Sequence, residues 1–308
     1  MDISVVIPVY GCRKALPELH RRLTETLSSL VKEYEIILVD DCCPQHSWED
    51  ISRICQEDDH VVGIHLSRNF GQMRAITAGI HESKGDWVVV MDCDLQDPPE
   101  AIPQLYEKAN QGYDIVFSRR MHRKDSKMTL FLSGLYYKFY NYLTGTAHDP
   151  ALGNLSIASR KVIEEFCKMG EQTREYILFL EWLGFRKSVI EIEGEERADG
   201  KSSYTFAKKV AMALDLLTAY SNKPLVISVD IGFLISTVSF IYLILLVVQY
   251  CLNTSIVPGW TSIIASVFLM GGLLMIMIGI VGIYVGNIFL ETKHRPLYVI
   301  QEIKNKKD

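Results

Sequence analysis

The chain has 308 residues, of which 48% are hydrophobic, and its formal net charge is −5. The length allows one large domain and a smaller part, and the negative charge excludes nucleic acid as an expected partner. The apolar residues are concentrated after about residue 225, which indicates membrane segments rather than a larger core. Residues 1–5 lack a basic n-region, so they predict a strand rather than a signal peptide.

The N-terminal part of the chain alternates patterns that are typical of strands and helices. Strands are predicted over residues 3–9, 35–39, 61–66, 86–91 and 114–118. Helices are predicted over residues 16–32, 48–57, 72–83 and 99–111. Unbroken apolar runs such as residues 3–9 are typical of strands covered on both faces. This repetition predicts an α/β fold, with a mostly parallel sheet and helices on both of its faces.

Polar residues gather at the predicted carboxyl ends of these strands, where open α/β sheets bind their ligands. These clusters contain Tyr10, Asp40, Asp41, Asn69, Asp92, Asp94, Arg119 and Arg120. No Gly-x-Gly-x-x-Gly motif follows the first strand, and the chain has no Walker loop. The sequence therefore excludes a standard dinucleotide or P-loop site.

An acidic motif, Asp92-Cys93-Asp94-Leu95-Gln96, directly follows the apolar run at residues 87–91. Side chains two positions apart on an extended chain point the same way, so we expect Asp92, Asp94 and Gln96 to present oxygens to one hard cation. A partly hydrated Mg²⁺ or Mn²⁺ that binds carboxylates and substrate phosphates is the usual arrangement at such a site. The alternative is a polar turn that caps the strand.

The cysteines form no Cys-x-x-Cys pair and no Cys/His cluster with zinc spacing. The seven are Cys12, Cys42, Cys43, Cys55, Cys93, Cys167 and Cys251. Their number is odd, and the simplest expectation is reduced thiols in a cytosolic domain.

The pattern between residues 126 and 220 is less regular. Residues 131–143 are rich in aromatic side chains, which predicts either a core helix or a surface that meets lipid or acceptor. Residues 188–193 predict a strand, and a charged loop follows over residues 195–204. Residues 204–220 predict an amphipathic helix, which packs on the domain or lies in the membrane interface. Its position just before an apolar segment favours the interface.

Two uncharged segments, residues 231–250 and 262–289, are each long enough to cross a bilayer. The turn between them, residues 251–260, has no Lys or Arg, whereas lysines precede the first segment and basic residues follow the second. By the positive-inside rule, both termini are predicted to be cytoplasmic. A buried helical hairpin in a soluble protein is the alternative, which these lengths disfavour.

The predicted organisation has four parts. Residues 1–205 form a cytoplasmic catalytic domain, and residues 206–227 form an interfacial helix and linker. Residues 228–289 form a two-helix transmembrane hairpin in the cytoplasmic (inner) membrane, and residues 290–308 form a cytoplasmic basic tail. Glycines in the second span allow close contact between helices.

Four motifs carry a resemblance to a known family. They are Val5-Val6-Ile7-Pro8-Val9-Tyr10, Val39-Asp40-Asp41, Ser67-Arg68-Asn69-Phe70-Gly71 and Met91-Asp92-Cys93-Asp94-Leu95-Gln96-Asp97-Pro98-Pro99-Glu100. These resemble the family 2 glycosyltransferases with the GT-A fold. With the two trailing spans, nearly the whole chain is similar to the polyisoprenyl-phosphate glycosyltransferases, which include dolichol-phosphate mannose synthase and the bacterial GtrB and ArnC-type enzymes. Residues 92–100 and 197–204 are the most specific parts of this similarity.

The resemblance implies an inverting enzyme that moves a sugar from a nucleotide-diphosphate sugar to a polyprenyl phosphate, such as undecaprenyl phosphate, at the cytoplasmic leaflet. It implies a metal, Mg²⁺ or Mn²⁺, bound by Asp92, Asp94 and Gln96. It implies donor-binding roles for Pro8, Val9, Tyr10, Asp40, Asp41, Asn69, Gly71, Asp92, Cys93, Arg119, Arg197, Ser202, Ser203 and Tyr204. With the glycine-rich spans, it also suggests a homo-oligomer such as a tetramer.

Three positions depart from the family pattern. Gly11-Cys12 stands where the family often has an acidic residue after the tyrosine, and Ser202-Ser203-Tyr204 stands where it often has Ser-Lys-Tyr. Asn154 stands where it often has an aspartate that has been considered as a base. A phosphate monoester is mostly ionised at neutral pH, because its second pKa is about 6, so the proposed acceptor needs no strong base.

Asp94, Asp149 and Glu181 are candidates for orienting the acceptor, and Asn154 is kept as a candidate catalytic position. For Glu181, a carboxylate on a helix face beside Trp182 is the stronger interpretation. For Asp149, which precedes Pro150, a role in a turn is equally plausible. A basic run is either a solvated face or a contact with lipid phosphate. This run consists of Arg120, Arg123, Lys124 and Lys127.

Two other functions compete with this one. A processive polysaccharide synthase of the same fold usually has more spans and a Gln-x-x-Arg-Trp motif, which this chain lacks. A non-catalytic membrane partner subunit with a degenerate site is the second, and the intact acidic motif argues against it.

Overall fold

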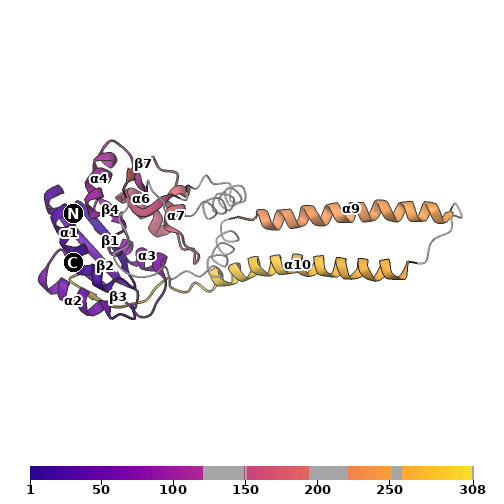
Figure 1. Cartoon of the computed structure of the whole chain (residues 1–308), viewed down its shortest axis with the longest axis horizontal. Coiled ribbons are helices and arrows are strands. Elements are labelled where there is room, and N and C mark those ends of the chain that lie inside the picture. The colour runs from indigo at the N-terminus through magenta and orange to yellow at the C-terminus, as the bar shows by residue number, and fades with distance from the viewer. Residues whose placement is uncertain (121–148, 150, 194–220, 252–258, 307–308) are drawn as a thin grey trace. The chain divides into compact units, whose positions relative to one another are not determined.

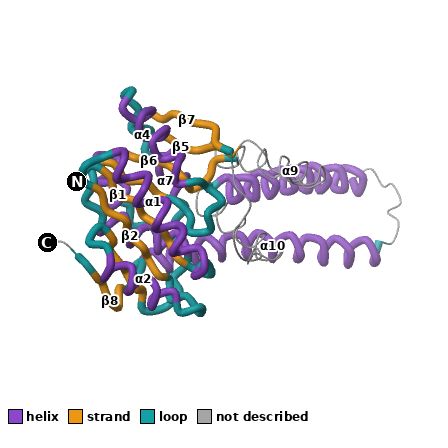
Figure 2. The backbone as a smooth tube through the Cα atoms, turned by 60° about the vertical axis from the view of Figure 1, so that its left-hand side comes forward, coloured by secondary structure: helices purple, strands orange, loops and turns teal. Residues whose placement is uncertain are grey.

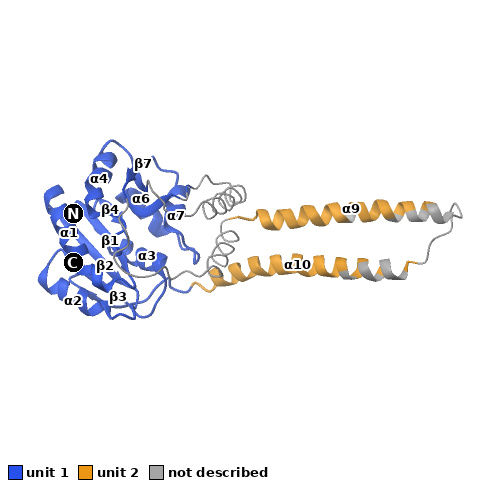
Figure 3. Cartoon of the chain, viewed as in Figure 1, with its two compact units in different colours: residues 1–131, 148–203, 295–308 blue, residues 132–147, 204–294 orange. Residues whose placement is uncertain are grey.

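The structure is a computed structural model of the whole chain, and it describes residues 1–120, 149, 151–193, 221–251 and 259–306 (Figure 1). The chain divides into two compact units (Figure 3). One consists of residues 1–131, 148–203 and 295–308 and contains the sheet. The other consists of residues 132–147 and 204–294 and contains two long apolar helices.

Strands and helices alternate in the N-terminal part, as the sequence predicts. The strands are β1 (Ile3–Val9), β2 (Tyr34–Asp40), β3 (Val61–Leu66), β4 (Trp87–Val90) and β5 (Ile115–Arg120). The helices are α1 (Leu16–Leu30), α2 (Ser47–Glu57), α3 (Gln72–Glu82) and α4 (Ile102–Asn110), with 3₁₀ turns η1 (Arg13–Ala15) and η2 (Pro99–Ala101). Every predicted element of this part is present, with small differences at the ends.

The described residues of the first unit contain five further elements. They are β6 (Leu152–Ser159), α6 (Arg160–Lys168), α7 (Tyr176–Trp182), β7 (Lys187–Ile192) and β8 (Ile300–Lys304). Of these, the sequence pattern predicts β7 and does not predict the other four.

Among the described residues, the strands form one sheet in the order β7-β5-β6-β4-β1-β2-β3-β8. β1 lies in parallel between β2 and β4, and β3 continues the parallel part. β6 and β8 run antiparallel to their neighbours. The prediction of a mostly parallel sheet is confirmed.

Helices cover both faces of the sheet (Figure 2). Ile3, Val5 and Ile7 of β1 share one apolar core with residues of α1, α2 and α4. On the opposite face, α3 lies so close that a Cβ at Gly79 would be 2.4 Å from Cγ1 of Val6. The two faces of β1 are therefore both buried, as its unbroken apolar sequence predicts.

The chain returns to the sheet after the second apolar helix and adds β8 to the free edge of β3. The side chain of Asn305 donates a hydrogen bond to the carbonyl of Val61 at 3.1 Å, and Lys306 forms an ion pair with Glu82 at 2.6 Å. The composition of residues 290–308 predicts a basic tail. It does not indicate strand β8, because charged residues suit both a solvated tail and an exposed strand at the edge of a sheet.

The second unit contains α9 (Lys223–Cys251) and α10 (Trp260–Thr292). Each includes a segment that is long and apolar enough to cross a membrane, Lys223–Tyr242 and Leu269–Thr292. The apolar side chains described along these segments are mostly exposed rather than packed in a core. This exposure is expected of lipid-facing helices and disfavours the buried hairpin. The prediction of two apolar helices is confirmed.

Candidate active site

The loops that follow β1, β2 and β4 meet at one edge of the sheet, because β1 lies between the other two strands. Tyr10 follows β1 there and is 48% exposed, so its ring is open to a ligand. Pro8 and Val9 are buried strand residues and contribute to the core instead. Asp40 ends β2, and Asp92 follows β4 after one intervening residue.

The acidic motif turns instead of continuing as extended chain. β4 ends at Val90, and Leu95 has a left-handed φ of 59°. The alternating row expected for Asp92, Asp94 and Gln96 is therefore interrupted at Leu95, between Asp94 and Gln96. The alternative interpretation, a polar turn at the strand end, describes the backbone better.

Asp92 is a half-buried carboxylate at the start of the motif. Its Oδ1 accepts a hydrogen bond from the Gln72 side chain at 2.7 Å and another from the Asn154 side chain at 3.0 Å. Burial raises the pKa of Asp92 to about 6, and the nearby Asp94 and Asp97 add to the rise, while the bond from Asn154 opposes it. The antiparallel pairing of β4 with β6 brings Asn154 beside this carboxylate.

Arg120 binds the last two residues of the acidic turn, Gln96 and Asp97. Its Nε and Nη2 donate to the two oxygens of Asp97 at 2.6 and 2.8 Å, and its Nη1 donates to Oε1 of Gln96 at 3.2 Å. Asp97 is buried, and this pairing raises the pKa of Arg120 although burial acts against it. Arg120 is therefore a paired, partly buried cation, which corrects the idea of a solvated basic face at this position. The sequence pattern gives no indication of this role for Asp97.

Arg119 and Asp149 form an ion pair next to the paired Arg120 at the end of β5. Asp149 also accepts a hydrogen bond from the backbone N–H of Ala151 at 2.9 Å, and its carbonyl accepts one from the N–H of Leu152 at 3.2 Å. These bonds support the turn interpretation of Asp149. They leave Arg119 held close to the start of β6.

Asp40 and Asp41 are buried and organise the surrounding loops. Asp41 accepts the backbone N–H groups of Phe70 and Gly71 at 2.7 and 2.9 Å, which fixes the loop that carries Asn69. Asp40 accepts the N–H of Cys43 at 3.3 Å and bonds to Nδ1 of His65 at 2.7 Å. Burial raises the pKa of both carboxyls.

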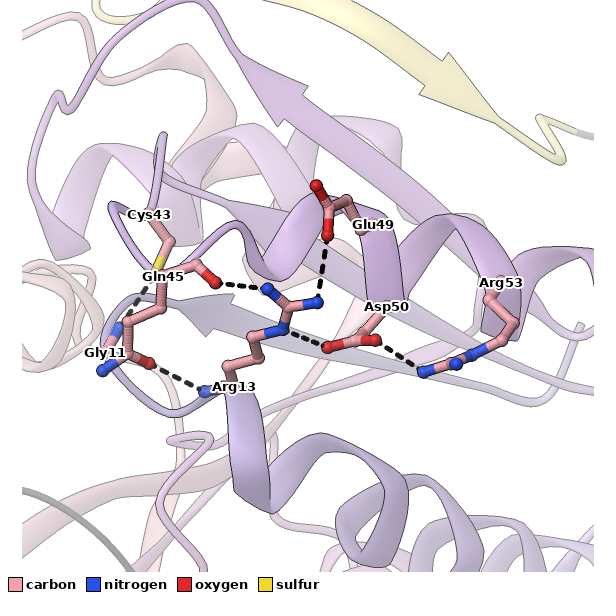
Figure 4. A network of polar contacts seen from close by, with 7 residues as sticks. All are labelled: Gly11, Arg13, Cys43, Gln45, Glu49, Asp50 and Arg53. Atoms are coloured by element: carbon pink, nitrogen blue, oxygen red, sulfur yellow. Dashed lines mark hydrogen bonds and ion pairs between the residues drawn. The ribbon is translucent and has the colours of Figure 1, made fainter.

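Arg13 ties the loop after β1 to the loop and helix after β2 (Figure 4). Its guanidinium donates to the carbonyl of Gln45 at 2.7 Å and pairs with Glu49 at 3.0 Å and Asp50 at 2.5 Å. Between the same two loops, the N–H of Gly11 donates to Sγ of Cys43 at 3.2 Å. The loop that carries Tyr10 and the loop after β2 are thus held together by contacts within the protein.

A disulfide joins Cys12 to Cys93, so the loop after β1 is linked to the acidic turn. The prediction of reduced thiols is wrong for this pair. The two cysteines lie 81 positions apart, and only the adjacency of β1 and β4 brings them together. Cys93, predicted to bind the donor, has its sulfur engaged in this bond. Cys42, Cys43, Cys55 and Cys167 are free.

Glu181 lies on α7 and forms an ion pair with Lys187 at 2.7 Å. This contact agrees with a helix-face carboxylate, and the neighbouring Trp182 is 74% exposed. Other predicted features lie outside the described residues. These are Arg197, Ser202, Ser203 and Tyr204, the cations at 123, 124 and 127, the aromatic segment at 131–143 and the amphipathic helix at 204–220.

The predicted metal ligands supply oxygen donors without forming a complete cage. In the part of the chain that the structure describes, no three His, Cys, Asp or Glu side chains are placed to hold a metal ion together. Asp92, Asp94 and Asp97 nevertheless concentrate negative charge in one turn, and the cation of Arg120 is paired with Asp97. A divalent cation bound by Asp92, Asp94 and donor phosphates would balance that charge and suits hard oxygen ligands.

A family model described as glycosyl transferase family 2 matches residues 4–166. The chain belongs to this family. It is a glycosyltransferase, as its motifs imply, and its similarity to the polyprenyl-phosphate branch extends beyond residue 166 into the apolar helices.

Relatives of this family 2 glycosyltransferase match over nearly their full length. The bactoprenol glucosyl transferase of Shigella phage SfV is 32% identical over 307 residues, which cover 99% of this chain and 100% of that protein. The undecaprenyl-phosphate 4-deoxy-4-formamido-L-arabinose transferase of Proteus mirabilis (strain HI4320) is 34% identical over 304 residues, which cover 98% and 93%. With the two apolar helices, these relatives indicate membrane association.

Solved structures show the fold alone. Mannosyl-3-phosphoglycerate synthase from Rubrobacter xylanophilus has a TM-score of 0.52 at 15% identity, covering 71% of this chain and 73% of that chain. Glucosyl-3-phosphoglycerate synthase from Mycobacterium tuberculosis, solved with Mn²⁺, UDP and phosphoglyceric acid, has a TM-score of 0.50 at 16% identity, covering 70% and 76%. The predicted GT-A class is confirmed.

Proposed function

We propose that this glycosyltransferase moves a sugar from a nucleotide-diphosphate sugar to a polyprenyl phosphate, such as undecaprenyl phosphate. The observation that carries the proposal is the combination, in one chain, of a partly buried acidic turn at the sheet edge and two helices apolar enough to cross a membrane. Relatives named for bactoprenol and for undecaprenyl phosphate support the acceptor class.

Donor binding is assigned to the loops around Tyr10, Asp40, Asp41 and Gly71. Asp92 and Asp94 would hold Mg²⁺ or Mn²⁺, which supplies positive charge to the departing nucleoside diphosphate. Gln96 is a weaker candidate ligand, because its side-chain oxygen accepts a bond from Arg120. A solved structure of the same fold with bound Mn²⁺ supports this choice of ion.

The nucleophile is an oxygen of the lipid phosphate, which is already ionised at neutral pH. A single displacement with inversion at the anomeric carbon therefore needs no strong base. Asn154 fits this scheme, since its amide steadies Asp92 instead of accepting a proton. Arg119, which pairs with Asp149, is proposed to approach a phosphate, and Glu181 is a less favoured candidate because Lys187 already pairs with it.

Both termini are proposed to be cytoplasmic, with transfer at the cytoplasmic leaflet. β8 pairs with β3, so residues 300–304 must lie on the same side of the membrane as residues 1–120. Two spans satisfy this condition, and the distribution of Lys and Arg favours the cytoplasm. The proposed catalytic domain, residues 1–205, then receives its last strand from the segment after the hairpin.

Replacement of Asp94 by Ala tests the function directly. Membranes that contain the full chain would be assayed with undecaprenyl phosphate, Mn²⁺ and a panel of labelled nucleotide sugars. We expect transfer to fall at least about a hundredfold, a loss typical of charge-stabilising groups, while insertion is unchanged. Asp59→Ala, at an exposed aspartate before β3, is the matched control.

Two results would contradict the proposal. Wild-type turnover by Asp94→Ala with saturating donor would overturn the metal assignment. Absence of both transfer and donor hydrolysis in the unaltered protein, with every nucleotide sugar, would instead support a non-catalytic membrane subunit.

A further inference from the structure

We infer that His65, Trp48 and Glu302 are positioning residues for donor binding. In this arrangement the strand that follows the second apolar helix holds the imidazole that orients the Asp40 carboxylate. The inference rests on the proposed function, because it takes Asp40 as part of the donor site. It adds residues that neither the motifs nor the relatives assign.

Asp40 is held at both of its oxygens. It is 1% exposed, its Oδ2 lies 2.7 Å from Nδ1 of His65, and its Oδ1 accepts the N–H of Cys43 at 3.3 Å. The parallel pairing of β2 with β3 places Asp40 directly opposite His65. Bonds at both oxygens fix the rotamer of this carboxylate and therefore the packing of the donor loops around it.

The His65 ring is in turn held by Trp48, near the start of α2. The two rings stack with centroids 5.0 Å apart and an angle of 21° between their planes. Trp48 therefore restricts the rotation of the imidazole, which sets the direction of its bond to Asp40. Two stacked rings from separate elements are more rigid than either ring alone.

Trp48 is anchored by the last strand of the sheet. Its Nε1 donates to Oε2 of Glu302 at 3.2 Å, and Nζ of Lys304 lies 5.6 Å from its ring centroid. Glu302 stands opposite His65 in the pairing of β3 with β8. A chain of contacts thus runs from Glu302 through Trp48 and His65 to Asp40.

The contact between Glu302 and Trp48 is separate from the backbone pairing of β8 with β3. Backbone pairing alone would cover β3 with almost any strand sequence, whereas the contact with Trp48 requires an acceptor at position 302. At the other end, Cys43 connects Asp40 to Gly11, beside Tyr10. A change at Glu302 is therefore expected to reach the donor loops without contact between that residue and the ligand.

The test measures nucleotide binding by the full-length protein in detergent. UDP, GDP, CDP and dTDP are titrated with Mn²⁺ by calorimetry, and the nucleotide with the lowest Kd for the unaltered protein is used throughout. His65→Leu keeps a side chain of similar volume and removes the N–H group that can bond to Asp40. His65→Asn keeps an N–H group near the position of Nδ1. We expect His65→Leu to raise Kd about tenfold, as for loss of a bond to a charged group, and His65→Asn to stay within about threefold.

Variants of Glu302 test the same inference independently, by the same measurement of Kd. Glu302→Leu removes the acceptor for Trp48 and should raise Kd about threefold, whereas Glu302→Gln keeps an acceptor and should leave Kd unchanged. Lys306→Ala, which breaks another contact of the same tail, is the matched control. In transfer assays the donor KM should rise with Kd while kcat changes little.

Several outcomes overturn the inference. The first is a nucleotide Kd in His65→Leu equal to that of the unaltered protein. The second is an equal rise of Kd in His65→Asn and His65→Leu, because a purely structural role of His65 predicts that the asparagine does not restore binding. If His65→Leu does not fold, Trp48→Phe replaces it, since this variant keeps a ring and loses the N–H. If the unaltered protein binds none of the four nucleotides, the proposed function fails and this inference fails with it.

Discussion

Asn154 stands where the family often has an aspartate that has been considered as a base, and the structure gives its amide a different contact. Its amide donates to Oδ1 of Asp92 at 3.0 Å and so stabilises the ionised carboxylate. An aspartate there would place two carboxylates within hydrogen-bond distance of each other. The resulting repulsion would oppose the ionisation that metal and donor binding require.

We therefore expect Asn154→Asp to lower transfer at pH 7 at least tenfold, which corresponds to about 1.4 kcal/mol of lost transition-state stabilisation. The measurement is kcat with saturating nucleotide sugar and polyprenyl phosphate. Asn154→Ser, which removes most of the amide without adding charge, is the comparison. Faster turnover in Asn154→Asp would show instead that a base limits the reaction.

Single residues of the site differ in how far sequence predicts them. The position of Asp92 and Asp94 after an apolar strand is predicted, and their binding of a metal stays a prediction. The positions of Asp97, Gln72 and His65 are not predicted, because their partners come from distant segments and depend on strand order. The Arg120 cation, close in sequence to other basic residues, pairs with a buried carboxylate that local pattern does not reveal.

The disulfide between Cys12 and Cys93 is a residue-scale feature with a measurable effect on stability. It closes a loop of about 80 residues, which in the chain-entropy account corresponds to about 4.5 kcal/mol of unfolding free energy. Cytosolic disulfides are usually transient or redox-sensing, so the response of this disulfide to a reductant is the property to measure.

We expect dithiothreitol to lower the melting temperature of the purified protein, and to have no such effect on Cys12→Ser. Alkylation followed by mass spectrometry should label exposed Cys42 in the native state. Cys12 and Cys93 should be labelled only after reduction. Cys55→Ser, at a buried free thiol outside this pair, should keep the response to reductant; labelling of Cys12 without reductant would contradict the prediction.

At the element scale, α3 depends on close approach to the sheet. A Cβ at Gly79 would lie 2.4 Å from Cγ1 of Val6 and 3.0 Å from Cγ2 of Val39. These neighbours are branched side chains in fully buried strands, so they have little room to move. α3 carries Gln72 at its start, and its position therefore matters to Asp92.

Gly79→Ala should lower the unfolding free energy by about 1–3 kcal/mol through overpacking, a loss that outweighs the helix propensity gained. Thermal unfolding in detergent gives the comparison. Gly170→Ala is the control, because an added Cβ there meets nothing within 4 Å. Equal melting temperatures for the two variants would show that α3 shifts without cost.

The elements themselves were predictable where local pattern decides them. Residues 3–9 and 61–66 match β1 and β3 because mostly apolar runs bounded by polar turns suit buried parallel strands. β6 was missed because its first residues, Leu152-Gly153-Asn154, mix apolar and turn-forming types. Its antiparallel insertion between β4 and β5 is a long-range choice that no local period encodes.

At the scale of the whole molecule, both apolar helices lie in the sequence between the last strand, β8, and the other strands of the sheet. The hydropathy pattern predicts those helices, since length and composition alone define them. It does not predict β8, whose exposed charges resemble a solvated tail. The consequence is that the sheet is complete only when the chain has passed through both helices and returned.

A chain truncated at residue 203 should therefore be less stable and more prone to associate than the complete unit. It loses β8 and leaves the backbone of β3 unpaired, and open strand edges pair with other chains. Joining residues 295–308 to residue 203 through a Gly/Ser linker should restore a higher melting temperature and reduce association, measured by thermal unfolding and size-exclusion chromatography. The same linker carrying a scrambled version of residues 295–308 is the control, because it matches composition without the Glu302 and Asn305 contacts. Equal behaviour of the truncated and rejoined chains would show that the sheet does not need its last strand.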